Sequence, residues 1–171
     1  MKNDTIMDEE SQRFMAFEGL RDWCVSALKQ VERMNIAIRE RNDESPSFNC
    51  EKHLFLISAW KVVEHVDWVK KLNFVDADKF TDFGEMREPL KAMRDKNEHV
   101  IEYFRSEGRF PDDWWYIAPD GSCCDASATV GTLIGGRADW ALIKNDIEKM
   151  LAALPKHYYP GRDGQPGSFV L

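Results

Sequence analysis

The sequence lacks any long apolar stretch. Its 171 residues contain no run close to the roughly 18 apolar residues that a membrane-spanning helix requires. The first 14 residues, MKNDTIMDEESQRF, also lack the basic segment followed by an apolar segment that characterises a signal peptide. We therefore expect a cytoplasmic protein with no membrane partner.

Cysteines are few, and their spacing does not suit a metal site. The four cysteines are Cys24, Cys50, Cys123 and Cys124, so no Cys-x-x-Cys pair exists and the one close pair is vicinal. Neither a zinc site nor an ordinary disulfide favours adjacent cysteines. Cys24 and Cys50 fall in helical patterns, where a thiol is usually a small core residue. We expect reduced, mostly structural thiols.

An excess of basic residues is missing as well. The chain has 23 Lys and Arg residues against 30 Asp and Glu residues, which gives a formal net charge of −7. Broad, non-specific binding of nucleic acid normally requires a basic surface, so the composition argues against that function. A local basic pocket remains compatible with it, because Lys91, Arg94 and Lys96 lie close together in the sequence.

Four amphipathic helical patterns dominate what the sequence does contain. Hydrophobic residues make up 43% of the chain and charged residues 31%, as in ordinary globular domains. Apolar side chains recur at three- and four-residue steps over 9–41, 47–71, 89–106 and 138–154. Pro89 suits the first turn of the third helix, and Pro155 ends the fourth. Because the connections are short, the pattern predicts an all-α, up-and-down bundle of four main helices that forms a single domain over 1–171.

One small β-hairpin is expected as an insertion around 109–138. Turn-forming Gly, Pro and Asp residues recur closely in this region, and the segments Trp114–Ile117 and Thr129–Ile134 between them favour strand. The two ends of the chain, 1–8 and 156–171, are polar or rich in Gly and Pro, so we expect them to be irregular.

The third helical pattern carries the densest group of chemically active side chains. Its apolar face consists of Leu90, Met93, Val100 and Phe104, and Asn97 places an amide within that face. Because such an interruption lies next to the core rather than on a solvated face, we take this helix as the candidate site.

Arg94 and His99 of this helix supply the two groups that RNA cleavage without a metal requires. Arginine is a permanent cation whose fork of donors fits a phosphate, and it would stabilise the charge on a phosphorane. Histidine titrates near neutral pH and can move the proton of a 2′-hydroxyl or of the leaving group. At about 100° per residue, His99 sits roughly 140° around the helix axis from Arg94, so the two side chains would have to converge in a groove between helices.

The segment Arg94-Asp95-Lys96-Asn97-Glu98-His99 resembles the signature of the HEPN superfamily, which is Arg, a polar residue, three variable residues and His. The resemblance implies a helical bundle that cleaves or binds RNA without a cofactor, often within a toxin–antitoxin or other defence system. It also implies a homodimer in which two copies of the motif face each other, with an antitoxin or another protein as a further partner. By this resemblance Arg94 and His99 are catalytic and Asp95 supports them. The residues expected to contact the substrate are Lys91, Lys96, Asn97 and Glu98.

Two other hypotheses for the side chains of this helix remain open. One is a structural network in which Arg94 pairs with Glu98 and His99 packs against an aromatic ring. The other is a metal-binding bundle, although Arg94 and Lys96 would repel a cation and the Glu-x-x-His pattern of di-iron sites is absent. The ligand types for such a site would come from Glu64, His65, Asp67, Glu98, His99 and Glu102.

A non-catalytic interaction module is the alternative from another functional class. Aromatic residues dominate the energetics of many protein interfaces, and Trp114, Trp115 and Tyr116 form a compact group of them. The competing interpretation is that these three side chains only cover the end of the bundle.

Overall fold

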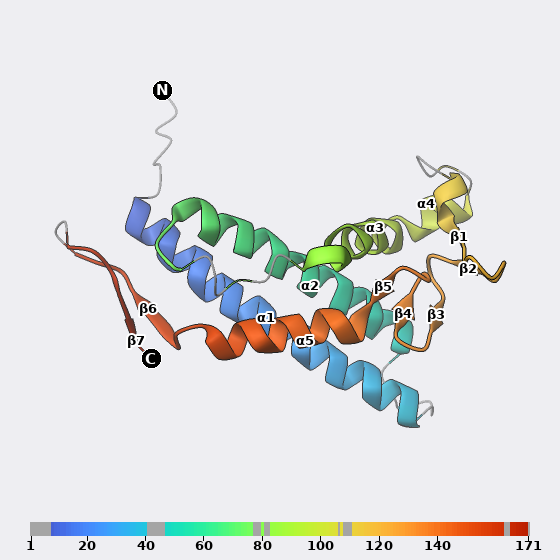
Figure 1. Cartoon of the computed structure of the whole chain (residues 1–171), viewed down its shortest axis with the longest axis horizontal. Helices are drawn as coiled ribbons and strands as arrows, with labels where there is room; N and C mark the ends of the chain where they lie inside the picture. The colour runs from blue at the N-terminus through green and yellow to red at the C-terminus, as the bar shows by residue number, and fades with distance from the viewer. Residues whose placement is uncertain are drawn as a thin grey trace.

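The computed structural model describes residues 8–40, 47–76, 80, 83–105, 107, 111–162 and 165–170. In chain order its α-helices are α1 (Glu9–Glu40), α2 (Phe48–Leu72), α3 (Arg87–Glu98), α4 (Val100–Phe104) and α5 (Trp140–Ala153) (Figure 1). Short 3₁₀ helices cover Gly84–Met86 and Pro111–Trp114. In this part of the chain no helix is both long enough and apolar enough to span a bilayer.

Helices α1 and α2 form an antiparallel pair that supplies half of the described buried hydrophobic core residues (Figure 1). Their buried residues recur at helical spacing, as the sequence predicts, and Cys24 is among them. Cys50 is exposed at the start of α2, so the expectation of a core position for this thiol is wrong. An ion pair joins the C-terminal part of α1 to the first turn of α2, where Arg33 donates two hydrogen bonds of 2.7 and 2.8 Å to the buried carboxylate of Glu51.

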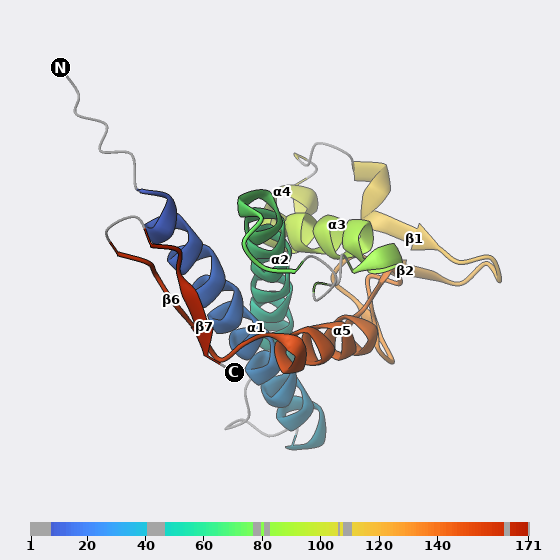
Figure 2. The ribbon, with the colours of Figure 1, turned by 60° about the vertical axis from the view of Figure 1, so that its left-hand side comes forward.

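The remaining long helices cross this pair instead of running alongside it. Figure 2 shows α3 and α5 lying across α2 and α1, respectively. α5 begins at Trp140, two residues later than expected, because Asp139 caps it by accepting hydrogen bonds from the amides of Ala141 and Leu142. The up-and-down arrangement predicted from the sequence is therefore wrong, although the four long helical segments exist.

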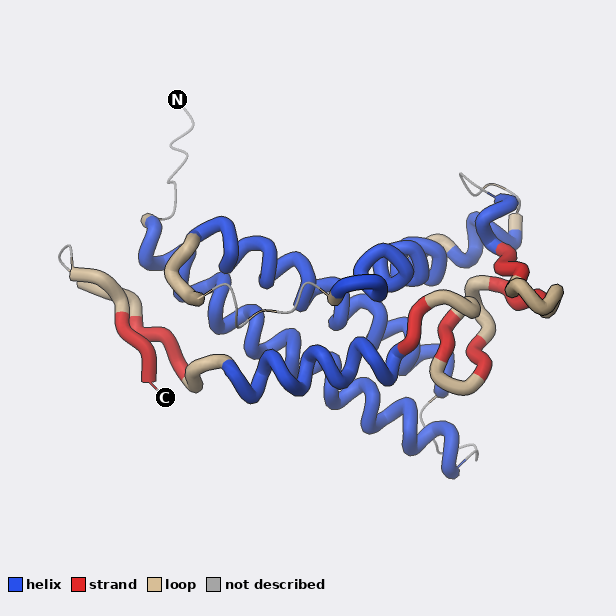
Figure 3. Tube along the Cα trace, viewed as in Figure 1, coloured by secondary structure: helices blue, strands red, loops and turns tan. Residues whose placement is uncertain are grey.

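The expectation of an all-α fold with one hairpin is also wrong. The described residues form seven short strands in three small antiparallel sheets, so the fold mixes α and β structure (Figure 3). The strands are β1 (Trp115–Ile117), β2 (Cys123–Asp125), β3 (Thr129–Val130), β4 (Leu133–Ile134), β5 (Ala138–Asp139), β6 (His157–Tyr159) and β7 (Ser168–Val170). Gly121 and Gly131 adopt positive φ at tight turns, and these turns pair each strand with a nearby neighbour. As a result, β1 pairs with β2 and not with the 129–134 segment.

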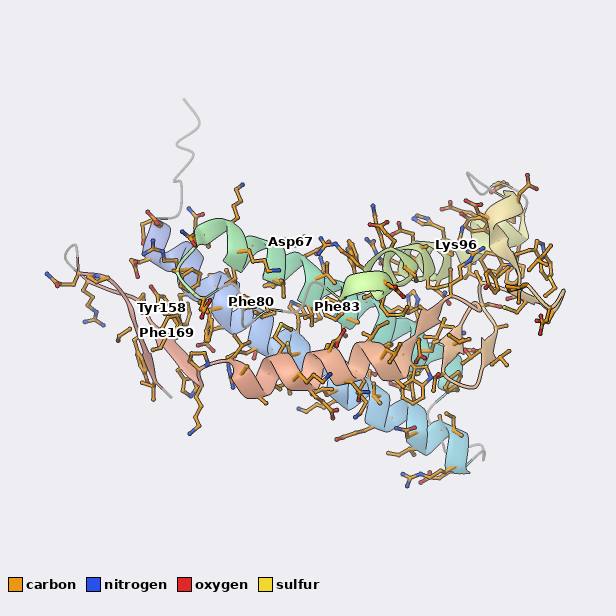
Figure 4. All side chains as sticks on the ribbon, in the orientation of Figure 1. Asp67, Phe80, Phe83, Lys96, Tyr158 and Phe169 are labelled. Carbon is orange, nitrogen blue, oxygen red and sulfur yellow. The ribbon has the colours of Figure 1, made fainter. Side chains whose placement is uncertain are left out.

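The C-terminal segment that we expected to be irregular forms the β6–β7 hairpin on the side of α1. Tyr158 and Phe169 lie together at this end of the molecule, as Figure 4 shows, with ring centres 5.0 Å apart. Phe169 also contacts Phe17 of α1 at 5.3 Å. The high Gly and Pro content hid a short alternation in which Tyr158 faces inward between two exposed neighbours.

The third helix is broken where the sequence predicts continuity to residue 106. α3 begins at Arg87, with Pro89 in its first turn, and ends at Glu98. His99 leaves the helical conformation at φ −106° and ψ 21°, and α4 then covers only five residues. This break turns Tyr103 onto Trp114, with stacked rings 4.9 Å apart, and it leaves Phe104 exposed although the helical pattern predicts it on the buried face. The predicted helix end at Ser106 and Gly108 lies outside the described residues.

Candidate functional site

Arg94 contacts an aromatic ring of α2 and two carboxylates of its own helix, α3. Its guanidinium carbon lies 5.4 Å from the centre of the Trp60 ring. One terminal nitrogen donates to Glu98 at 2.7 Å, and Nε lies 3.1 Å from Asp95 without the alignment of a hydrogen bond. The side chain is only 24% exposed. The Arg94 cation was predicted to bind phosphate, but these contacts already give it partners within the protein.

Glu64 adds to the negative charge around Arg94. Partial burial opposes its ionisation, but hydrogen bonds and charge from Lys61, a hydrogen bond from Trp60 and the charge of Arg94 together hold the pKa of this carboxyl below its usual value. The carboxylate accepts hydrogen bonds from both Trp60 and Lys61. Arg94 therefore belongs to a surface network of charged side chains between α2 and α3.

Lys96 does not face solvent as a substrate-binding residue would. Lys96, labelled in Figure 4, is 7% exposed, and its ammonium group lies 5.3 Å from the centre of the Tyr103 ring. Burial lowers the pKa of this ammonium group from its ordinary value, and the nearby carboxylate of Asp113 opposes that shift. Lys96 thus joins α3 to α4 and to the segment that leads into β1.

Asn97 has a structural partner on another element. Its side-chain amide donates to the carbonyl of Met93 at 2.8 Å and to the carbonyl of Ala126 at 3.3 Å. Because a buried carbonyl without a donor is costly, this contact explains why an amide interrupts the apolar face of α3. The loop after β2 is thereby fixed to the helix.

His99 lies at the break between α3 and α4 and is open to solvent. Its side chain is 56% exposed, and Nδ1 lies 3.0 Å from the carboxylate of Glu102. A carboxylate on Nδ1 favours the tautomer with the proton on that nitrogen, so Nε2 is available as a proton acceptor. The imidazole has the hydrogen bonding of a general base, at an exposed position.

The predicted site residues do not converge on one cleft. Arg94 turns to Trp60, Asp95 and Glu98, whereas His99 turns to Glu102. Lys91 is exposed on α3, while Lys96 and Asn97 point into packing contacts. In the isolated chain, the structure therefore favours the structural network for Arg94 and leaves His99 as the accessible member of the motif.

The candidate metal ligands also turn to different partners. His65 contacts the carbonyl of Lys61 through Nδ1 at 2.9 Å, and Asp67 pairs with Arg87. Among the residues that the structure describes, no three His, Cys, Asp or Glu side chains are grouped closely enough to hold a metal ion.

Helix α4 and strand β1 lie at the same end of the molecule (Figure 1). Both elements expose large apolar side chains. Trp114 is buried as a cover for the core and Tyr116 lies under the guanidinium of Arg137, but Trp115 between them is 55% exposed. The other exposed members are Ile101, Phe104 and Ile117, at 63%, 71% and 70%. No exposure was expected for these three from the sequence, and the helical pattern assigned Phe104 to the buried face. The alternation of a strand could have revealed Ile117, because a residue two positions from an outward Trp115 shares its face.

Comparisons with protein-family models, with curated proteins and with solved structures found no match to this chain. The HEPN resemblance therefore stays a prediction that rests on the six-residue motif alone.

Proposed function

We propose that the protein is an interaction module that binds a protein partner through the exposed apolar side chains of α4 and β1. We call Ile101, Phe104, Trp115 and Ile117 the α4–β1 surface. The observation that carries the proposal is that all four are more than half exposed at one end of the molecule. Large apolar side chains that are exposed at one end of a molecule favour an interaction site there, because water solvates them poorly.

Packing contacts and hydrogen bonds between the elements of this end also support the proposal. Trp114 is buried between the two elements, stacking on Tyr103 and meeting Phe104 edge-on at 5.6 Å. Arg137 donates to the carbonyls of Asp113 and Trp115 at 3.0 and 2.8 Å and so holds the start of β1 in place. An anchor that is already ordered loses little conformational entropy when a partner binds.

The test is a capture experiment with matched variants. The full chain is immobilised and the proteins that bind from cells that express it are quantified by mass spectrometry. We expect one stoichiometric partner, which Phe104→Ser and Ile117→Ser should lose. The control Leu142→Ser, at a 50% exposed position on α5, should retain this partner. An identical set of bound proteins for all four chains would refute the proposal.

HEPN-like, metal-independent cleavage of RNA is the second candidate, and the exposed His99–Glu102 pair favours it. His99 would accept the proton of the 2′-hydroxyl, and Glu102 would hold the imidazole in the required tautomer. Arg94 would have to exchange Glu98 for a phosphate oxygen, in a homodimer that brings a second copy of the motif to the site.

Purified protein incubated with mixed RNA in EDTA tests this candidate. Cleavage should be lost in His99→Ala and Arg94→Ala. The control is His157→Ala, which should retain cleavage; the side chain of His157 is 61% exposed and, like His99, lies beside a carboxylate, that of Glu18. Light scattering at the same concentrations reports whether a dimer is present. Absence of cleavage by a dimeric sample, or equal cleavage by all variants, removes RNA cleavage from consideration.

A further inference from the structure

We infer that the partner segment bound by the α4–β1 surface is basic and amphipathic, with apolar side chains on one face and Lys or Arg residues around them. The inference rests on the proposed function and adds the chemistry of the partner. It is carried by the charge that surrounds the apolar side chains.

The exposed charges around the α4–β1 surface are mostly negative. Glu102 lies between Ile101 and the Tyr103–Phe104 pair on α4, and its side chain is 53% exposed. The further exposed acidic residues of this end are Glu107, Asp112, Asp113 and Asp120. Among the described residues from α4 to β2, Arg105 is the one exposed basic side chain. An apolar surface bordered by carboxylates is complementary to apolar anchors bordered by cations.

Two further basic side chains among the described residues of this end are engaged by other parts of the protein. Lys96 is buried against Tyr103, and Arg137 is committed to two backbone carbonyls and lies 5.6 Å from the centre of the Tyr116 ring. These two cations stabilise the packing of α3 and β1, but they do not neutralise the outer carboxylates by direct contact. The imbalance is therefore built into the arrangement of side chains and does not follow from the net charge alone.

This charge pattern disfavours the other occupants. A second copy of the chain would bring its own carboxylates to face these, and RNA or an anionic membrane would meet the same repulsion. Like charges placed opposite each other at an interface are strongly unfavourable as a general rule. A basic segment gains from the same field, both in affinity and in its rate of association.

Two synthetic helical peptides of equal length provide the probes. Both carry the same leucine face, and their polar faces consist of lysine in one and glutamate in the other. Fluorescence anisotropy of the labelled peptides measures binding to the full chain. We expect the lysine peptide to bind about tenfold or more tightly than the glutamate peptide, and its affinity to fall several-fold when the salt concentration rises from about 0.05 to 0.5 M.

Variants of the protein connect this preference to the α4–β1 surface. The double change Glu102→Lys with Asp112→Lys should reduce or reverse the preference for the lysine peptide. Phe104→Ser should weaken the binding of both peptides. The controls are Glu148→Lys and Leu142→Ser, which make the same kinds of change on the exposed side of α5 and should leave binding unaltered. Circular dichroism confirms that each variant folds.

Equal binding of the two peptides, or an unaltered preference in the charge-reversal variant, overturns the inference. A Phe104-dependent dimer of the wild-type chain in light scattering also overturns it, because a second copy then occupies the surface. If the capture experiment yields a Phe104-dependent partner while the lysine peptide fails to bind, the proposed function stands and the basic partner is wrong. If both experiments fail, both proposals fall.

Discussion

The guanidinium carbon of Arg94 lies 5.4 Å from the centre of the Trp60 ring. The sequence suggests that the Arg94 cation binds a phosphate, but this contact directs it toward a ring of α2. Together with the hydrogen bond to Glu98, it makes Arg94 a link between the long helical pair and α3. A cation held in this way contributes to folding whether or not it also meets a substrate.

Replacing Arg94 by alanine is therefore expected to lower the free energy of unfolding by about 1 kcal/mol, the sum of a cation–π contact and an i,i+4 ion pair at a partly exposed position. Lys144→Ala is the control, because Lys144 pairs with Glu148 at the same spacing on α5. It should cost about 0.3–0.5 kcal/mol. Urea unfolding measures both variants, and equal losses would show that the Trp60 contact adds nothing.

Asn97→Ala should destabilise the protein by about 1–2 kcal/mol, since it leaves the Ala126 carbonyl without its donor. Asn145→Ala, an exposed position on α5, should change stability by less than about 0.5 kcal/mol. The measurement is chemical unfolding followed by circular dichroism. An Asn97→Ala protein as stable as the wild type would mean that the amide is not needed to hold the loop after β2.

Gly19→Ala should be destabilising, although alanine is the better helix former. A Cβ at this position would lie 2.6 Å from Nε2 of His65, which is held by its contact with the Lys61 carbonyl. In a His65→Ala background the same change should become stabilising by up to about 1 kcal/mol, the ordinary advantage of alanine over glycine in a helix. The four proteins form a double-mutant cycle. Additive effects would show that the two residues do not meet.

Tyr158 should make the β6–β7 hairpin sensitive to alkaline pH. Burial and the hydrogen bond to the Glu10 carboxylate raise the pKa of the Tyr158 phenol to about 12. Because this folded-state pKa lies above the unfolded value near 10, the stabilisation is complete below about pH 10 and is lost as the pH rises through about 12.

The melting temperatures of wild type and Tyr158→Phe test this between pH 7 and 12. The wild type should be the more stable protein below about pH 10, and its advantage should shrink above that pH. Comparison with Tyr158→Phe removes the contribution of the other tyrosines. A constant difference across the whole range would contradict the role of the phenol proton.

Sequence reasoning succeeds where a pattern is local and long. The buried stripes of α1 and α2 and the body of α5 follow from apolar residues at helical spacing, and the proline at 155 ends the last helical segment as predicted. It fails where several short segments compete for partners. Which strand pairs with Trp115–Ile117 depends on the turn at Gly121, and the β-propensity of 129–134 carries no information about that choice.

For the candidate site, the sequence by itself determined the chemical types in Arg94–His99, the excess of acidic residues and the helical stripe that places this segment beside the core. Only the tertiary structure decided what these groups do, because side-chain partners lie on other elements. Trp60 turns Arg94 toward α2, Tyr103 covers Lys96, and the packing of Tyr103 on Trp114 accompanies the break at His99. That break leaves Ile101 and Phe104 in solvent, which no helical periodicity across the segment could predict.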